Sequence, residues 1–335
     1  MHKFLCIVLV SMGIAGPAIA LPDDALPDTL RMNEIQVIGT HNSYHLRPDD
    51  DKLEAFRKFD PREAATWEYS HAPLFDQLEA GIRAFELDLN YYQGAWSVYH
   101  VPNLAENTSC REFVECLKGI QLWSQNNPTH VPVTVLLEIK EDSVGLPGKT
   151  EAITDEALRN METVIRSVFP VESMVTPAIV QGEAPTMSEA IQNQGWPLLK
   201  DCRGKMVFLL LEKPGIQDQY KALFSEAKEA LCFTFSMTPE DNQPDFAVSD
   251  APMVEKIQPW VKAGFIVRTR ADAGLMQGRN NDTTRREQAF ASGAQIISTD
   301  FPPGAGEWRS FETGYRAVFA DGNCVRVNPV LVPTE

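Results

Sequence analysis

Two runs of almost uninterrupted apolar residues constrain the fold of this chain more than any other feature. They are Val133–Leu137 and Val207–Leu211. Runs of this length and composition are typical of strands that are buried on both faces, as in a parallel sheet covered by helices. A strand with one face in water would instead alternate apolar and polar residues.

Similar strand-like runs recur along the whole chain, and helix-like stretches separate several of them. The strand-like runs are Ile35–Thr40, Arg83–Tyr91, Val131–Ile139, Lys205–Glu212, Phe233–Met237, Phe265–Thr269 and Gln295–Thr299. The helix-like stretches are Asp155–Phe169, Ile216–Leu231 and Thr283–Ser292. Strands that alternate with helices favour a parallel sheet or an α/β barrel. We therefore predict an α/β protein with a single TIM-type (β/α) barrel, allowing for distortion, since 335 residues suit that fold.

The first twenty residues differ in character from the rest of the chain. A short basic start is followed by the apolar run Phe4–Ile14 and by the small residues around Ala18 and Ala20. This pattern is typical of a cleavable signal peptide, and the run is shorter than the ~20 apolar residues of a membrane span. We predict a signal peptide over residues 1–20, cleaved near Ala20, and one catalytic domain over residues 21–335 that is secreted or periplasmic.

The chain is acidic, with a formal net charge of -16. This charge argues against a nucleic-acid partner and against polybasic adsorption to anionic lipid. An acidic surface is compatible with an exported protein that binds a divalent cation. We expect no transmembrane segment after the signal peptide, and a monomer.

Five cysteines remain after the predicted cleavage site, and an exported chain can oxidise them. Cys110 and Cys116 flank a short loop and are the best candidates for a disulfide. Cys202 and Cys232 are a second, weaker candidate pair. An odd number leaves at least one thiol free or paired between chains.

Charged and polar residues end three of the predicted strands in the first 140 residues. His41 and Asn42 follow the first strand, Glu86 and Asp88 lie in the second, and Glu138 and Lys140 end the third. Chemistry in a TIM barrel lies at the carboxyl ends of the strands. Charged groups at the end of an apolar strand are costly unless they meet a partner. We therefore expect these side chains to meet in one site.

Four oxygen side chains of this set could hold a metal ion. Glu86 and Asp88 are two residues apart, so they share one face of a strand. Asn42 and Glu138 add two further oxygen donors. Ligation by oxygen alone suits calcium or magnesium rather than zinc, so the pattern predicts a hard cation, with Ca²⁺ as the expected cofactor.

Two histidines and several basic residues complete the predicted site. His41 and His100 each follow a strand, and histidine can exchange a proton near neutral pH. The basic residues that follow strands are Lys140, Lys213, Arg268 and Arg270. They could bind a phosphate, or they could balance the charge of the acidic cluster. The pattern predicts a metal ion, two imidazoles and a phosphate-sized anion.

The order of these motifs resembles the catalytic half of the phosphoinositide-specific phospholipases C. The motifs are Gly39–Tyr44, Glu86–Asp88, His100 and Glu138–Lys140. More narrowly, they resemble the secreted, calcium-dependent bacterial phosphatidylinositol phospholipases C. The close match spans roughly His41 to Lys140. The calcium-independent bacterial enzymes replace the metal with an arginine, whereas this chain keeps the carboxylates.

The resemblance implies a reaction and a role for each matched residue. Phosphatidylinositol would be cleaved to diacylglycerol and an inositol phosphate, cyclic or acyclic, by attack of the inositol 2-hydroxyl. His41 would stabilise the pentacoordinate phosphorane, and His100 would protonate the diacylglycerol alkoxide. The implied calcium ligands are Asn42, Glu86, Asp88 and Glu138.

Other roles stay open within the resemblance. Glu138 or Glu86 could also act as the base on the 2-hydroxyl. Lys140, Lys213 and Arg268 are candidates for binding the phosphate or headgroup of the substrate. The preferred inositol phosphodiester, in a membrane or in solution, is left open.

Two alternative functions fit the same residues. One is a glycerophosphodiester phosphodiesterase or a sphingomyelinase-D-like enzyme, which also uses a Glu-x-Asp pair and two histidines. Such enzymes usually open with His-Arg, whereas this chain has His41-Asn42. The other is a barrel that binds calcium and a headgroup without turnover.

Overall fold

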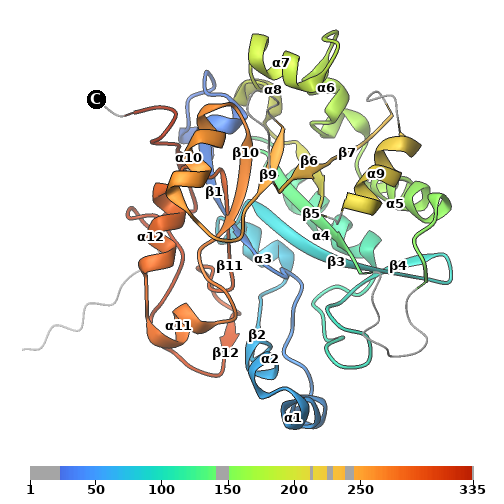
Figure 1. The fold of residues 1–335 in the computed structure, drawn as a ribbon, viewed down its shortest axis with the longest axis vertical. Helices are drawn as coiled ribbons and strands as arrows, with labels where there is room; N and C mark the ends of the chain where they lie inside the picture. The colour runs from blue at the N-terminus through green and yellow to red at the C-terminus, as the bar shows by residue number, and fades with distance from the viewer. Residues whose placement is uncertain (1–22, 141–150, 212–213, 225–228, 238–244, 334–335) are drawn as a thin grey trace, which may run out of the picture.

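A curved sheet of parallel strands forms the centre of the molecule, and helices pack around it (Figure 1). The computed structural model describes residues 23–140, 151–211, 214–224, 229–237 and 245–333. The predicted signal peptide lies outside the described residues. No described helix combines the length and the apolar composition that crossing a membrane requires.

The sheet path runs in the order β7, β6, β5, β3, β1, β11, β10, β9, β8, and every neighbouring pair on it is parallel. These strands are β1 (Ile35–Thr40), β3 (Ala84–Tyr92), β5 (Val133–Ile139), β6 (Met206–Leu210), β7 (Cys232–Phe233), β8 (Phe235–Ser236), β9 (Phe246–Val248), β10 (Ile266–Arg270) and β11 (Ile296–Thr299). The two ends of the path, β7 and β8, are separated only by Thr234. The sheet is therefore a nearly closed barrel, as predicted.

Four shorter strands lie off this path. They are β2 (Tyr69–Ser70), β4 (Ala95–Val98), β12 (Trp308–Arg309) and β13 (Val325–Val327). β4 pairs antiparallel with β3, and β13 pairs antiparallel with β1. β2 and β12 form a separate two-stranded antiparallel sheet.

Helices connect the strands and cover the barrel. The α-helices are α1 (Asp50–Phe59), α2 (Pro61–Thr66), α3 (Leu74–Glu79), α4 (Phe113–Asn126), α5 (Asp155–Val168), α6 (Pro177–Gln181), α7 (Met187–Gln194), α8 (Leu199–Cys202), α9 (Pro214–Leu223), α10 (Val254–Lys262), α11 (Met276–Asn280) and α12 (Thr284–Ala291). Three short 3₁₀ helices are Asp23–Ala25, Met32–Glu34 and Val171–Ser173.

The strands with long apolar runs are buried on both faces, as their composition predicts. Val135 and Leu137 of β5 belong to a hydrophobic cluster that also contains residues of α4 and α5. Leu136, between them, belongs to a second cluster with Val37 of β1 and Leu209 of β6. β1 and β6 are not neighbours in the sheet, so this second cluster fills the interior of the barrel.

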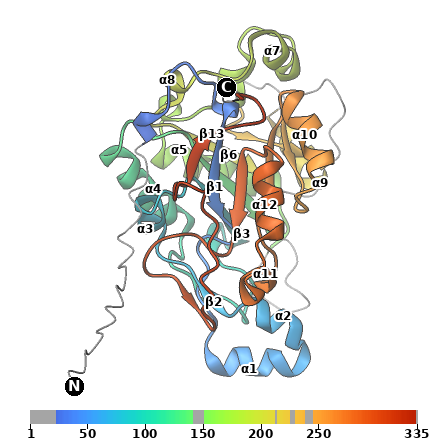
Figure 2. The ribbon, with the colours of Figure 1, turned by 90° about the vertical axis from the view of Figure 1, so that its left-hand side faces the viewer.

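The helices α1 and α2 project from one end of the molecule (Figure 2). They follow β1 in the chain, so this end is the one where the carboxyl end of β1 lies. β2 and α11 lie at the same end, whereas α7 and α8 lie at the opposite end (Figures 1 and 2). This arrangement places several surface elements beside the carboxyl ends of the barrel strands.

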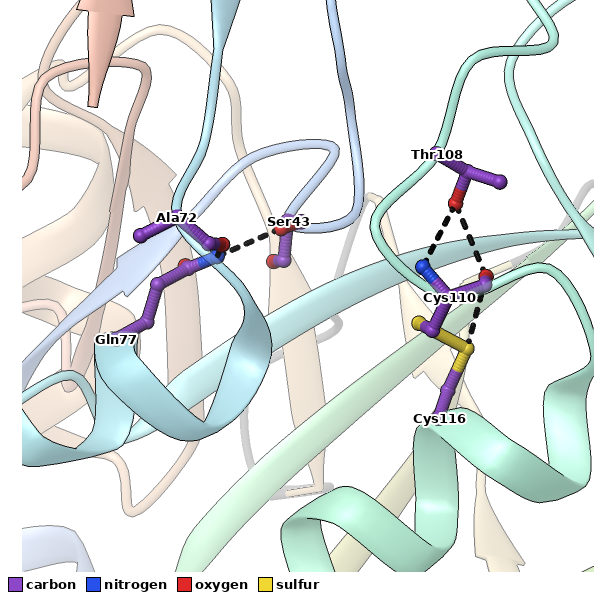
Figure 3. Close-up of a disulfide and its surroundings, with 6 residues drawn as sticks. All are labelled: Ser43, Ala72, Gln77, Thr108, Cys110 and Cys116. Atoms are coloured by element: carbon purple, nitrogen blue, oxygen red, sulfur yellow. Dashed lines mark hydrogen bonds between the residues drawn. A yellow bond between two sulfur atoms is a disulfide. The ribbon is translucent and has the colours of Figure 1, made fainter. Parts of the chain in front are cut away.

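One of the two predicted disulfides is present. Cys110 and Cys116 are bonded, with their Cα atoms 5.3 Å apart (Figure 3). The prediction for Cys202 and Cys232 is wrong, because both are free, buried thiols, as is Cys324. Cys202 ends α8 and Cys232 lies in β7, and their spacing in sequence contains no information about the distance between these elements.

Candidate active site

The predicted site residues lie at the ends of neighbouring strands. His41 and Asn42 follow β1, and β1 pairs with β3, which carries Glu86 and Asp88. β3 pairs in turn with β5, in a register that sets Asp88 directly beside Glu138. Parallel pairing of adjacent strands thus brings residues from three parts of the sequence to one end of the barrel.

Glu86, Asp88 and Glu138 form a cluster of carboxylates that could hold a metal ion. One oxygen atom from each of the three lies within 4.8 Å of the others. Glu86 and Asp88 are 2% and 0% exposed, so they have little access to water. Asn42 is also buried and has a left-handed backbone conformation, with a φ of 46°. Ser43, the next residue, donates its backbone N–H to the carbonyl of Glu86 at 3.0 Å, which keeps this loop against β3.

The donor set fits a hard cation such as calcium. All candidate ligand atoms are oxygens, which suits calcium. Burial raises the pKa of Asp88 to about 7, although the charge of Lys140 opposes this rise. Neither carboxylate oxygen of Asp88 has a well-formed hydrogen bond within the described part of the chain. A buried carboxylate in this state would be stabilised by a divalent cation.

Two predicted substrate-binding residues contact the carboxylates directly. Nζ of Lys140 lies 2.6 Å from Oε1 of Glu138 and 3.0 Å from Oδ2 of Asp88. Nη2 of Arg268 lies 2.6 Å from Oε2 of Glu86. Both basic side chains therefore balance the acidic cluster in this structure. Lys213, the third predicted residue, lies outside the described residues.

His41 is held by an aspartate that sequence reasoning did not assign to the site. Nδ1 of His41 lies 2.8 Å from Oδ1 of Asp300, and Nε2 lies 3.6 Å from Oε1 of Glu86. Nη2 of Arg270 lies 3.1 Å from the other oxygen of Asp300 and 3.2 Å from Nδ1 of His41. Burial opposes ionisation of Asp300, but His41 and Arg270 outweigh it and hold its pKa well below the usual range.

Asp300 could also have been assigned from the sequence, as Arg270 was. Asp300 follows a predicted strand, so it shares with His41 the signal that identified the other site residues. Its partner in space could not be read from the sequence, because 259 positions separate His41 from Asp300. The sequence did not show that β1, which His41 follows, and β11, which Asp300 follows, are neighbours in the sheet.

His100 has surroundings of a different kind. Its ring lies edge-on to the rings of His45 and Trp67, with centroids 6.1 and 5.7 Å away. Burial lowers the pKa of His100 well below its usual range, and the charge of Lys140 adds to this effect. Nδ1 of His100 has no hydrogen-bond partner among the described residues.

One cavity joins the two histidines. It has a volume of about 270 Å³, and its lining includes His41, Asn42, His100, Arg270 and Asp300. Residues of α2 and of the segment after it form another part of its wall, so the arm formed by α1 and α2 lies over the cavity. The three carboxylates do not line this cavity; Glu86 reaches it through its contact with His41.

A buried glutamine supports the loop that carries His41 and Asn42. Nε2 of Gln77 donates to the carbonyls of Ser43 at 2.7 Å and Ala72 at 2.6 Å (Figure 3). Its Oε1 accepts from Oγ1 of Thr40 at 2.7 Å. These bonds hold both ends of the loop to α3, which favours one fixed placement of the two site residues.

Comparison with known proteins identifies one family. The family described as "Phosphoinositide phospholipase C, Ca2+-dependent" matches residues 30–94 and 90–329. No curated protein matches the chain.

Similar solved structures share the fold at low sequence identity. A calcium-dependent phosphoinositol-specific phospholipase C from Pseudomonas sp. is 15% identical, with a TM-score of 0.56. The match covers 93% of this chain and 99% of that one. A Ca²⁺-dependent phosphatidylinositol-specific phospholipase C from Streptomyces antibioticus is 18% identical, with a TM-score of 0.56 and coverage of 81% and 94%.

Proposed function

Since the chain belongs to the Ca²⁺-dependent phosphoinositide phospholipase C family, we propose that it cleaves phosphatidylinositol to diacylglycerol and an inositol phosphate. The observation that carries this proposal is the cavity lined by His41, Asn42 and His100, with the carboxylates of Glu86, Asp88 and Glu138 beside it. Two imidazoles and an oxygen-only cation site suit cleavage of a phosphodiester by a neighbouring hydroxyl. The family match favours this reaction over that of a glycerophosphodiester phosphodiesterase.

We assign calcium to Asn42, Glu86, Asp88 and Glu138. When bound, calcium would lower the pKa of the attacking hydroxyl and neutralise a nonbridging phosphate oxygen. Glu138 or Glu86 would accept the proton of the 2-hydroxyl. Glu138 is the more accessible of the two, with 35% of its side chain exposed against 2% for Glu86.

His41 would stabilise the negative charge of the phosphorane. Asp300 accepts a hydrogen bond from Nδ1, so the ring keeps a fixed orientation. Nε2 is the atom left for the substrate. Preorganised donors of this kind act where charge develops in the transition state.

His100 would protonate the departing diacylglycerol oxygen. Burial lowers the pKa of His100 in the free protein, which disfavours the protonated form. The phosphodiester is an anion, and its arrival in the cavity favours the imidazolium and so raises this pKa. Binding of the substrate would therefore create the acid that the reaction needs.

Lys140, Arg268 and Lys213 remain candidates for binding the substrate phosphate or headgroup. Lys140 and Arg268 are each paired with a carboxylate that we assign to calcium. Once the cation neutralises these carboxylates, the two basic side chains are available for an anionic group. Substrate binding would therefore depend on calcium as well.

The catalytic end also has features suited to a membrane surface. Phe59 at the end of α1 is 86% exposed, and Trp308 of β12 and Met276 of α11 are also exposed. All three elements lie at the end of the molecule that contains the cavity (Figure 1). Exposed apolar residues gathered at one end favour contact with lipid.

We also propose that the protein is exported as one catalytic domain over residues 21–335. The disulfide between Cys110 and Cys116 supports this, because such bonds persist in oxidising compartments. The sequence pattern of residues 1–20 supports it independently.

Phosphorus NMR of two digests tests the proposed function. We expect phosphatidylinositol to yield inositol phosphate, cyclic or acyclic, and diacylglycerol in the presence of calcium. Glycerophosphoinositol, which lacks the acyl chains, should react far more slowly. Release of glycerol phosphate from the soluble diester, with phosphatidylinositol left intact, would support the glycerophosphodiester phosphodiesterase alternative instead.

A further inference from the structure

A buried ion pair lies beside the candidate site and has no role in the mechanism above. β12 pairs with β2, and this pairing brings Glu307 to His71 across 236 positions of sequence. Nδ1 of His71 lies 2.9 Å from Oε2 of Glu307. Only 0% and 6% of the two side chains are exposed.

The carboxylate of Glu307 holds three groups. Oε1 accepts from the backbone N–H of Ala72 at 2.9 Å. Oε2 contacts His71 and also accepts from Nη2 of Arg309 at 3.0 Å. Burial raises the pKa of Glu307, but His71 and Arg309 outweigh this and hold the pKa below its usual range. The carboxylate of Glu307 is therefore an anion that the buried side chains of His71 and Arg309 both contact.

Each of these two side chains reaches the main chain of one member of the His41–Asp300 pair. Nε2 of His71 donates to the carbonyl of His41 at 3.0 Å. Nη2 of Arg309 donates to the carbonyl of Asp300. A carbonyl oxygen only accepts hydrogen bonds, so Nε2 of His71 must carry a proton, and the contact of Nδ1 with Glu307 fixes the ring in this orientation.

We propose that Glu307 is a positioning residue. Through His71 and Arg309, it keeps His41 and Asp300 in the relative placement that their hydrogen bond requires. The proposal rests on the proposed function only in taking His41 as part of the catalytic site. The His41–Asp300 hydrogen bond of 2.8 Å depends on the placement of two separate strand ends. A misplacement of about 1 Å in such an arrangement can reduce the rate ~10²-fold.

A purely structural role for the same contacts predicts a different result. Glu307 would then stabilise the pairing of β2 with β12, and its loss would lower stability whatever residue occupies position 41. A positioning role predicts an effect on turnover that disappears once His41 is absent. A double-mutant cycle separates the two, because coupled residues give non-additive effects.

The test uses Glu307→Gln, which keeps the shape of the side chain and removes its charge. We expect kcat on phosphatidylinositol to fall ~10- to 100-fold, with KM changed less than about twofold. In a protein that already carries His41→Ala, Glu307→Gln should not lower kcat any further. An unchanged kcat, or an equal fall in both backgrounds, would overturn the proposal.

Asp23→Asn is the matched control. Asp23 is 5% exposed and binds Nε of Arg83 at 2.7 Å and the backbone N–H of Val131 at 2.9 Å. Arg83 immediately precedes β3, so this pair lies at the opposite end of the barrel. We expect the variant to lose stability and keep the kcat of the wild type. If Glu307→Gln does not fold, His71→Phe enters the same cycle, since it removes the contact with Glu307 and the bond to the carbonyl of His41.

Proton NMR gives a readout that is independent of turnover. The proton that His41 shares with Asp300 should give a low-field signal, identified by its loss in His41→Ala. We expect this signal to shift or broaden in Glu307→Gln and to persist in Asp23→Asn. An unchanged signal would overturn the proposal. Failure of the wild type to cleave phosphatidylinositol would refute the proposed function, and the signal would still decide the positioning role.

Discussion

At the scale of single residues, the two site histidines differ in the charge of their neighbours. His41 faces two carboxylates, with Nδ1 2.8 Å from Oδ1 of Asp300 and Nε2 3.6 Å from Oε1 of Glu86. His100 lies half-buried beside aromatic rings, and desolvation and the charge of Lys140 disfavour its protonated form. The same residue type is thus suited to two roles, because different groups surround each ring.

This difference predicts how the two histidines respond to the leaving group. A general acid matters most for a strongly basic alkoxide such as that of diacylglycerol, where its help is typically worth ~10²–10⁴-fold. His100→Ala should lose activity of that order on phosphatidylinositol and recover much of it on an inositol nitrophenyl phosphate. His41→Ala should stay impaired on both substrates, because the phosphorane forms with either leaving group. Equal losses for His100→Ala would show that it is not the acid.

A third histidine predicts a pH dependence of stability. Burial lowers the pKa of His45 from 6.5 to about 3, although its contact with the carbonyl of Trp67 opposes this. Between these two values the unfolded chain binds a proton that the folded chain does not. The free energy of unfolding therefore falls as pH decreases below about 6.5, by up to ~1.4 kcal/mol per pH unit from this residue.

Chemical unfolding of His45→Gln between pH 4.5 and 7 measures this contribution. The variant should show a shallower loss of stability on the acid side than the wild type. His100 and His130, whose pKa values burial also lowers, would supply the remaining slope. Identical slopes for variant and wild type would mean that His45 does not enter the folded state as a neutral ring.

At the scale of elements, the sequence predicted the long barrel strands, joined β7 and β8 into the single run Phe233–Met237, and missed β9. β1 was predicted with its observed bounds, since it is an apolar run that ends in polar residues. β9 has three residues, too few to give a pattern. The arm formed by α1 and α2 was also missed, because its residues are mostly exposed and charged. Its place over the cavity follows from tertiary packing.

Site residues on elements without a sequence pattern could not be predicted either. Residues on adjacent strands, such as Asp88 and Glu138, could be grouped because each ends or lines a predicted strand. The contacts of Glu307 could not, since β2 and β12 have two residues each and no apolar pattern. Nothing in the sequence places His71 against His41 either.

The exposed end of α1 predicts that turnover depends on whether the substrate lies in a membrane or is dissolved. Phe59→Ser removes an apolar side chain that is 86% exposed and touches little of the protein interior. Turnover of phosphatidylinositol in vesicles should fall several-fold, as apolar burial in lipid is worth ~25 cal/mol per Å². Turnover of a soluble inositol phosphodiester should not change.

Leu122→Ser is the control for this prediction. Leu122 is 55% exposed on α4, a helix on the side of the barrel. It should affect neither substrate. A loss for Phe59→Ser that is equal in vesicles and in solution would assign α1 to the shape of the cavity rather than to contact with lipid.

At the scale of the whole molecule, the residues that stabilise the barrel and the residues of the candidate site lie in different places. The apolar clusters lie inside the sheet and between the sheet and its helices. The site carboxylates, the two site histidines and the basic side chains paired with them lie at one end of the barrel. There the positive charges of the basic side chains balance the negative charges of the carboxylates. Removing the metal from this end should leave the core intact, since the core does not depend on it.

Calcium titration of turnover and of binding, carried out in parallel, tests the central claim most directly. We predict no turnover of phosphatidylinositol in excess chelator, with the fold retained by circular dichroism, and a common midpoint for activity and calcium binding. Asp88→Asn should move both midpoints to higher calcium, because it removes a negative charge from the ion and keeps the shape of the ligand. Full activity in chelator, or an unchanged binding midpoint for Asp88→Asn, would contradict the assignment of calcium to this cluster.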